Sequence, residues 1–264
     1  MKILVLIKEV PDMATVKFDS EKGVVNRAGA DAEINPFDEN ALKAAVDLKR
    51  AYDDVKITAV TMGPPRSERS LRMAFAKGAD KMVLLTDREF GGSDTYATAR
   101  ILSAAIRHIR DYDLIICGEK SVDGDTAQVG AEVAEFLGIP HSYYVDSIKL
   151  EDGKVRVSVE NISGRRQERV MTCPCLVSVT KNVSRPELPT VRRKLLSLEQ
   201  DVEILNIGDL EELTPDNTGF AGSPTKVSKV VVPGIITRDT HIFREDTDGF
   251  AAKIEEVLSE KGLV

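Results

Sequence analysis

Residues 118–130 carry polar groups from which a phosphate-binding site can be built, and they read G-E-K-S-V-D-G-D-T-A-Q-V-G. The apolar run Leu114–Cys117 precedes them, and Ala131–Leu137, which has helical spacing, follows them. A loop between a strand and a helix offers free backbone N–H groups, and the helix N-terminus adds roughly half a positive charge. The segment therefore predicts a nucleotide-phosphate site, although it matches neither a Walker A sequence nor G-x-G-x-x-G.

The side chains of this loop divide by charge. Thr126 and Gln128 can donate hydrogen bonds to phosphate oxygens, and Gly124 allows the backbone to approach a ligand closely. Asp123 and Asp125 repel a phosphate, so we expect them to cap the helix or to accept from ribose hydroxyls or a ring N–H. The open alternative is that Asp123, Asp125 and Thr126 are caps of a helix that binds nothing.

The cysteines do not form a metal or redox motif. Cys117 lies in an apolar run, which predicts a small core residue. Cys173 and Cys175 are separated by a single proline, whereas redox and zinc pairs have the C-x-x-C spacing. Because the three histidines are scattered along the chain, the sequence predicts no metal site.

Composition narrows the class of protein. The chain has 264 residues, of which 42% are hydrophobic, so it can bury a full core. A net charge of −7 argues against nucleic-acid binding, whose footprint is basic. No apolar run approaches the roughly 18 residues of a membrane span, and the N-terminal apolar run is too short for a signal peptide. We therefore expect a cytoplasmic location and no membrane span.

Short apolar strands alternate with helical patterns through the first half of the chain. Strands are predicted over 2–7, 55–61, 81–85 and 114–117, and helices over 40–51, 67–76 and 95–109, the last capped by Asp94. This alternation predicts a mostly parallel sheet with helices on both faces. Ligands of such sheets bind beyond the carboxyl ends of the strands, so we expect the loops at 8–12, 62–65, 87–94 and 119–125 to share one crevice.

The pattern changes after about residue 137. Two runs, 147–150 and 154–159, flank Glu151-Asp152-Gly153 and predict a hairpin. A further turn at 161–165 leads into 167–171, and the chain returns to the core through 175–179. These segments predict a small antiparallel addition to the sheet.

The remaining third is less regular. Two prolines in the polar segment 180–190 predict an exposed loop, on which Val183 and Leu188 either dock another protein or pack on their own domain. From about residue 197 the chain is acidic and then irregular, with a strand predicted over 226–232 and an amphipathic helix over 250–258. With so little apolar sequence, we expect this part to be an arm that lies on a partner.

Six segments in order resemble one family. They are Lys8–Asp12, Asn35–Ala41, Met62–Pro64, Leu71–Ala74 leading to Gly78-Ala79-Asp80, Asp123–Gly130 and Pro189–Lys194. With these segments in register, the chain resembles the beta subunit of electron-transfer flavoproteins over nearly its full length. Composition and periodicity alone would not lead to this family.

The resemblance implies a fold and a division of the chain. The fold is a three-layer α/β/α arrangement with a mostly parallel sheet, similar to the adenine nucleotide alpha hydrolases. Residues 1–196 would form the nucleotide-binding core, including a partner-recognition loop at 181–190. Residues 197–264 would form a C-terminal arm that packs on the alpha subunit.

The resemblance also implies cofactors and partners. Members are heterodimers in which an FAD, held mainly by the alpha subunit, exchanges electrons with an acyl-CoA dehydrogenase or a related reductase. The beta subunit holds a second nucleotide, which is structural AMP in one branch and a second FAD in the electron-bifurcating branch, where NADH is the electron donor. No catalytic side chain is implied, because the flavin carries the redox chemistry.

The residues expected at these sites follow from the matched segments. The nucleotide site would include Leu6, Lys8, Asn35, Pro36, Phe37, Asp38, Met62, Gly63, Asp123, Gly124, Asp125, Thr126, Ala127, Gln128, Val129 and Gly130. Asn35 could read an adenine edge. Partner recognition would involve Val183, Arg185, Pro186 and Leu188, with Val183 as the expected apolar anchor.

Two segments favour the bifurcating branch. The loop 123–130 is similar to the bifurcating version, whereas the AMP-binding version tends to carry another acid at the position of Gly124 and a polar residue at that of Val129. The helix start at 91–98, with Asp94, Thr95 and Thr98, also resembles the bifurcating version and would lie against the second flavin or NAD(H). The alternatives are the AMP-binding branch, a stand-alone ATP-binding protein of the universal-stress type, and a nucleotide-free scaffold.

Overall fold

The computed structural model describes residues 1–12, 17–19, 24–26, 32–160, 163–226 and 240–264. The chain forms two compact units, residues 1–229 and 230–264. None of the described helices has the length and apolar character needed to cross a membrane.

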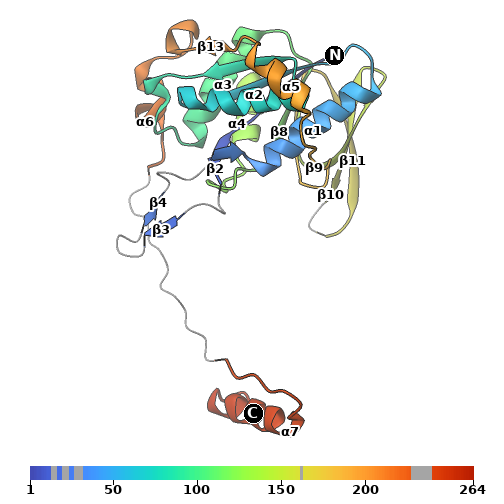
Figure 1. Cartoon of the computed structure of the whole chain (residues 1–264), viewed down its shortest axis with the longest axis vertical. Helices are drawn as coiled ribbons and strands as arrows, with labels where there is room; N and C mark the ends of the chain where they lie inside the picture. The colour runs from blue at the N-terminus through green and yellow to red at the C-terminus, as the bar shows by residue number, and fades with distance from the viewer. Residues whose placement is uncertain (13–16, 20–23, 27–31, 161–162, 227–239) are drawn as a thin grey trace. The chain divides into compact units, whose positions relative to one another are not determined.

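In the described part of the chain, the first unit is built on a nine-stranded sheet with the order β11-β10-β9-β12-β8-β1-β6-β7-β13 (Figure 1). The bounds of these strands are β1 Lys2–Leu6, β6 Lys56–Met62, β7 Lys81–Leu85, β8 Leu114–Gly118, β9 His141–Glu151, β10 Lys154–Glu160, β11 Arg166–Thr172, β12 Cys175–Val179 and β13 Glu203–Leu205. Seven neighbouring strands run parallel to one another, in the order β9, β12, β8, β1, β6, β7 and β13. β10 and β11 extend the sheet beyond β9 as an antiparallel addition. The predicted parallel sheet and hairpin are confirmed.

Successive residues of each strand point to opposite faces of the sheet, so an apolar strand puts apolar side chains on both faces. Helices cover both of these faces. On β1, Ile3 and Val5 join one buried cluster, and Leu4 and Leu6 join the other. The helices α1 Pro36–Ala51 and α2 Glu68–Lys77 contribute to the first cluster, and α3 Thr95–Ile109 and α4 Val129–Leu137 contribute to the second. The three-layer α/β/α class is therefore confirmed.

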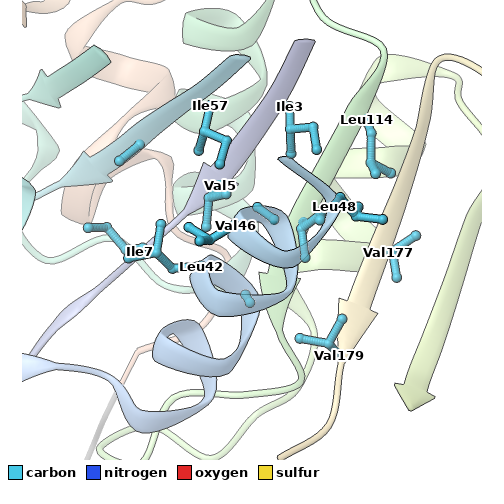
Figure 2. Packing of buried hydrophobic residues seen from close by; sticks show 14 of the residues in the cluster. Ile3, Val5, Ile7, Leu42, Val46, Leu48, Ile57, Leu114, Val177 and Val179 are labelled. Atoms are coloured by element: carbon cyan, nitrogen blue, oxygen red, sulfur yellow. The ribbon is translucent and has the colours of Figure 1, made fainter. Parts of the chain in front are cut away.

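The packing of α1 shows how the first layer is held. Its apolar residues Leu42, Val46 and Leu48 face strand residues such as Ile3 and Val177 (Figure 2). At about 25 cal/mol per Å² of apolar surface removed from water, burial of these residues is the main force that fixes α1 over the central strands. The first residue of α1 is thereby held at the carboxyl end of β1.

Smaller elements lie around this frame. Two short antiparallel pairs join β2 Glu9–Pro11 to β5 Ala32–Ile34 and β3 Lys17–Asp19 to β4 Val24–Asn26. Single helical turns form at η1 Pro65–Ser67, η2 Arg88–Phe90, η3 Ile207–Asp209 and η4 Pro215–Asn217. Three further helices come after β12 in sequence: α5 Val191–Leu198, α6 Gly219–Gly222 and α7 Thr247–Glu260.

The C-terminal third differs in part from its sequence pattern. Residues 203–205 pair with β7, so part of the range 197–229 belongs to the sheet unit. Three residues are too few for a detectable alternation, and this strand could not be predicted. The helix expected over 250–258 is present as α7, while the strand expected over 226–232 falls almost wholly outside the described residues.

Candidate functional site

A cavity of about 680 Å³ opens at the carboxyl ends of the central strands. Its lining includes Leu6 at the end of β1, Met62 at the end of β6 and Gly118 at the end of β8. From β1 the chain continues on one side to β6, whereas β8 lies on the other side, so this is the point where the strand order reverses. Such switch points are where open α/β sheets bind ligands, and the volume lies within the roughly 300–1,000 Å³ of ligand pockets.

Asp38, in the first turn of α1, joins β1 to β8 beneath the cavity. Its carboxylate accepts the N–H of Lys8 at 2.8 Å and the N–H of Gly118 at 3.1 Å. Burial raises the pKa of Asp38 to about 7, against the opposing effect of these hydrogen bonds. A Cβ on Gly118 would lie 2.5 Å from the Asp38 carboxylate and 2.6 Å from Cβ of Phe37, so glycine is required there.

Asn35 holds the loop that follows β8. It occupies the N-cap position of α1, yet its side chain makes no capping bond. The side-chain amide instead donates to the carbonyl of Lys120 at 2.9 Å and accepts the N–H of Val122 at 3.1 Å. Asn35 is 1% exposed. The expectation that it reads an adenine edge stays a prediction, and its observed contacts fix the loop.

The two aspartates of the loop form ion pairs and do not cap α4. Asp123 accepts from Nζ of Lys8 at 2.7 Å, and Asp125 lies 2.6 Å from Nζ of Lys120. Burial works against ionisation of Asp123, but the hydrogen bond and charge of Lys8 prevail and lower its pKa. The N-cap of α4 is Gln128, without a side-chain cap, so the capping roles considered for Asp123, Asp125 and Thr126 are wrong.

The backbone between these aspartates and α4 has an uncommon conformation. Asp125 and Ala127 have φ values of 54° and 55°, in the left-handed region that non-glycine residues seldom adopt. Within the described chain, no acceptor faces the N–H groups of residues 126–130. Strained backbone and unfilled donors together are typical of a ligand-binding loop.

The opposite wall is formed by the starts of α3 and α4 and by β9. Oγ1 of Thr95 donates to Oε1 of Glu132 at 3.2 Å, and the phenolic oxygen of Tyr143 accepts the N–H of Ala131 at 2.9 Å. A Cβ on Gly130 would lie 2.8 Å from this phenolic oxygen, so the absence of a side chain lets Tyr143 reach the helix. The second carboxylate oxygen of Glu132 is buried and has no hydrogen-bond partner in the described structure.

Asp94 connects this wall to a segment far along the chain. Its carboxylate accepts the N–H of Ala97, which confirms the predicted N-cap of α3. It also accepts the backbone N–H of Thr225 at 2.9 Å and the hydroxyl of Thr225 at 2.6 Å. Pro224 and Thr225 therefore line the cavity, although nothing in the sequence pattern places them there.

Most of the residues expected at the nucleotide site line this one cavity. They are Leu6, Lys8, Asn35, Asp38, Met62, Asp94, Thr95, Thr98, Gly124, Thr126, Ala127, Gln128, Val129 and Gly130. Pro36, Phe37, Gly63, Asp123 and Asp125 do not line it, although Asp123 and Phe37 contact residues that do. Glu132 and Tyr143 were missed, because a helix glutamate and a strand tyrosine carry no signal without the topology.

The expected partner-recognition residues lie on the loop after β12. Val183 is partly buried against the core, whereas Leu188 is 92% exposed, and Arg185 and Pro186 are also exposed. The loop is fixed to α1, because the Glu187 carboxylate pairs with Arg50 at 3.0 Å and with Lys43 at 3.2 Å. The apolar side chain that this loop presents is therefore Leu188 rather than Val183.

The cysteines take structural positions. Cys117 and Cys175 are buried, as predicted for Cys117, and burial raises the pKa of both thiols. No cluster of three metal-ligating side chains occurs among the residues that the structure describes.

The cavity has the chemistry of a nucleotide site. Unfilled N–H groups at the start of a helix suit a phosphate, and the lysines and Thr126 add further donors at the same mouth. The apolar strand ends Leu6 and Met62 suit an aromatic ring. The residues present therefore fit an adenine nucleotide such as AMP or FAD.

Comparisons with known proteins agree with this geometry. Residues 22–204 match the family model described as the electron transfer flavoprotein domain. The chain is 43% identical over 241 residues to the electron transfer flavoprotein subunit beta of Megasphaera elsdenii, covering 88% of each chain. It is 41% identical to the subunit of that name from Thermoanaerobacterium thermosaccharolyticum, and 36% identical to the caffeyl-CoA reductase-Etf complex subunit CarD of Acetobacterium woodii, each over the full length of both chains.

Proposed function

This chain belongs to the electron transfer flavoprotein family, in the group of the beta subunits, and from that premise we propose that it binds FAD in the cavity between β1 and β8. In this role it would move electrons between NADH, the FAD of an alpha subunit and an acyl-CoA dehydrogenase or reductase. The alternative within the family is that the same cavity holds a structural AMP. A stand-alone universal-stress protein is set aside, because the family match covers most of the chain.

The observation that carries the proposal is the row of unfilled N–H groups at residues 126–130, at the mouth of the cavity. These groups, with the hydroxyl of Thr126, would hold the phosphates. When bound, FAD supplies the redox chemistry. The chain's own residues bind and orient it, and no side chain here needs to act as an acid or a nucleophile.

The bifurcating branch is supported by a second segment of the cavity. Asp94, Thr95 and Thr98, at the start of α3, line the same space as residues 124–130. These residues would lie against the second flavin or NAD(H), and both segments are similar in sequence to the bifurcating version. The relative from Acetobacterium woodii is named as part of a caffeyl-CoA reductase complex, which supports a partner of the acyl-CoA reductase type.

The partner surfaces are proposed from the rest of the chain. Leu188, with Arg185 and Pro186, would form the contact with the dehydrogenase or reductase, because the loop is fixed to α1 and presents an almost fully exposed leucine. Residues 197–264 would include the arm that packs on the alpha subunit. Seven large apolar residues in the described part of the second unit are exposed in this chain alone, which is consistent with a covered surface in a heterodimer: Ile242, Phe243, Phe250, Ile254, Val257, Leu263 and Val264.

Replacement of Thr126 by leucine tests the cavity assignment. The substitution removes a donor and puts a bulky apolar side chain at the mouth, so the heterodimer is expected to lose the nucleotide of this chain and to keep the flavin of the alpha subunit. The measurement is the flavin and AMP released per heterodimer on denaturation. Thr172→Leu, on the exposed end of β11, is the matched control. An unchanged nucleotide content in Thr126→Leu would contradict the assignment.

A further inference from the structure

Residues 218–225, which we call the wall segment, form one side of the cavity. Pro224 and Thr225 line the cavity, and both residues are exposed in this structure, so a ligand can reach them. Thr225 is 131 residues along the chain from Asp94, its neighbour in the cavity lining. Because the two segments are so distant in sequence, the contacts between them decide whether this side of the cavity forms.

Hydrogen bonds hold the wall segment against the loop before α3. The N–H of Phe220 donates to the carbonyl of Gly91 at 3.0 Å. The N–H of Asp94 donates to the buried hydroxyl oxygen of Ser223 at 2.8 Å. The carboxylate of Asp94 accepts both the N–H and the hydroxyl of Thr225. Asp94 therefore faces the ligand space and also holds the wall segment.

The fit between the two segments leaves no room for a side chain at Gly219. Its φ is 54°, and a Cβ there would lie 2.1 Å from the carbonyl oxygen of Glu89 and 2.8 Å from that of Gly91. Both neighbours are backbone atoms, so no side chain can turn aside to admit the Cβ. Gly219 does not line the cavity, so a substitution there disturbs the seating of the wall segment without altering a residue that a ligand touches.

The wall segment is held by these polar contacts rather than by core burial. No large apolar side chain of the segment is buried, and Phe220 is 62% exposed. Segments with few buried apolar contacts and exposed hydrogen bonds are those that open locally, without unfolding of the whole domain. The wall segment therefore has a seated state, which this structure shows, and an open state in which Pro224 and Thr225 leave the cavity.

A ligand that gains contacts only in the seated state stabilises that state, and the effect is reciprocal. We propose that the nucleotide contacts Pro224 and Thr225 and so holds the wall segment seated, and that the seated segment in turn strengthens nucleotide binding. This inference rests on the proposed function, because it assumes a nucleotide in the cavity. The first unit ends at residue 229, so occupancy of the cavity fixes the chain just before the C-terminal unit begins.

Hydrogen exchange of the full-length chain, freed of bound nucleotide, tests the proposal. The probes are FAD and AMP in separate experiments, and the readout is the exchange of a peptide covering residues 218–225 by mass spectrometry. At a probe concentration of about 100 times the dissociation constant, exchange should slow at least about fivefold, and complete linkage would slow it about 100-fold. Exchange of β11, which is mostly exposed and lies outside the cavity, should not change.

Gly219→Ala tests the reciprocal effect through the dissociation constants of FAD and AMP, measured by calorimetry. Because only molecules with a seated wall segment bind tightly, the constant of the nucleotide that the wild type binds should rise at least about fivefold. Gly153→Ala is the matched control: Gly153 also has a positive φ, of 72°, but no atom lies within 4 Å of its Cβ position, so the constant should not change.

A second variant keeps the test decisive if Gly219→Ala does not fold, which thermal melting shows. Thr225→Val keeps the shape of an exposed side chain and removes its hydrogen bond to Asp94, so it should raise the same constant by a smaller factor. It should also speed the exchange of residues 218–225 when no nucleotide is bound.

The outcomes distinguish this inference from the proposed function. Tight binding of FAD or AMP with no change in the exchange of residues 218–225 would overturn the role of the wall segment and leave the nucleotide site intact. Normal dissociation constants in the folded variants would do the same. If the wild type binds neither probe, both the site and the inference are overturned.

Discussion

At the scale of single residues, the candidate site depends on polar side chains that bond to backbone. The carboxylate of Asp38 accepts from the ends of two strands, and the amide of Asn35 holds the following loop at two points. Both residues belong to the segment that the sequence associated with the nucleotide site. Their contacts show that they shape the cavity, whether or not they also touch the ligand.

Asp38 should make stability depend on pH. Its native pKa of about 7 lies above its ordinary value of 3.8, so between these values the native chain holds more protons than the unfolded chain. The contribution of Asp38 to the free energy of unfolding is fully present below about pH 4 and is lost as the pH rises through 7. The free energy of unfolding falls by at most about 1.4 kcal/mol per pH unit over this range. In Asp38→Asn the free energy of unfolding should therefore fall less steeply over this range.

Urea unfolding at several pH values measures these slopes. Asp53→Asn, which alters an exposed aspartate, serves as the control and should follow the wild type. If Asp38→Asn has the same slope as the wild type, burial of Asp38 does not govern its ionisation.

For the loop at residues 118–130, residue types predicted which residues line the cavity better than they predicted which contacts those residues make. The glycines, Thr126 and Gln128 are at the cavity as expected. The capping role considered for Asp123 and Asp125 was wrong, because their partners, Lys8 and Lys120, are identified only when β1 and β8 are placed side by side. Glu132 and Tyr143 could not be found for the same reason. That Asp123 and Asp125 accept from a ribose or a ring N–H stays a prediction.

At the scale of elements, hydrogen bonds and ion pairs hold the loop 181–190 against α1. Oγ of Ser184 donates to Asp47 at 2.8 Å, and Asn40 donates to the carbonyl of Ser184 at 2.7 Å. Hydrogen bonds from Arg50 and Lys43 lower the pKa of Glu187 to about 2, so this anchor stays ionised at any working pH. A fixed loop loses little entropy on binding, which suits a contact surface.

Leu188 should therefore matter for electron transfer and not for folding. Because its side chain is 92% exposed, Leu188→Ala should leave stability and nucleotide content unchanged. Electron transfer to an acyl-CoA dehydrogenase or reductase should become about tenfold or more slower at limiting partner concentration, as for loss of an interface anchor. Stopped-flow flavin absorbance measures this rate.

Two other substitutions make that experiment specific. Val170→Ala removes an exposed apolar side chain from β11 and should have no effect. Val183→Ala tests the residue that sequence reasoning favoured; since Val183 packs on the core, it should lower stability more than it lowers the transfer rate. A normal rate in Leu188→Ala would contradict the proposed contact.

At the scale of the whole molecule, hydrophobic periodicity was enough to predict the central sheet and its layers. β7, β12 and α3 have the predicted bounds, because each is an uninterrupted pattern with clear turn residues at its ends. The strand β13 and the cavity contact of Thr225 were not predictable, since each depends on a few residues far from their neighbours in sequence. The division of the chain near residue 196 and the role of its arm stay predictions.

The cofactor content of the heterodimer tests the central claim most directly. The chain would be purified with its alpha subunit and denatured, and the released nucleotides would be separated and counted. We predict two FAD per heterodimer and no AMP; one FAD with one AMP would place the chain in the AMP-binding branch with the same cavity occupied. One FAD and no other nucleotide would contradict the claim that residues 124–130 hold a nucleotide.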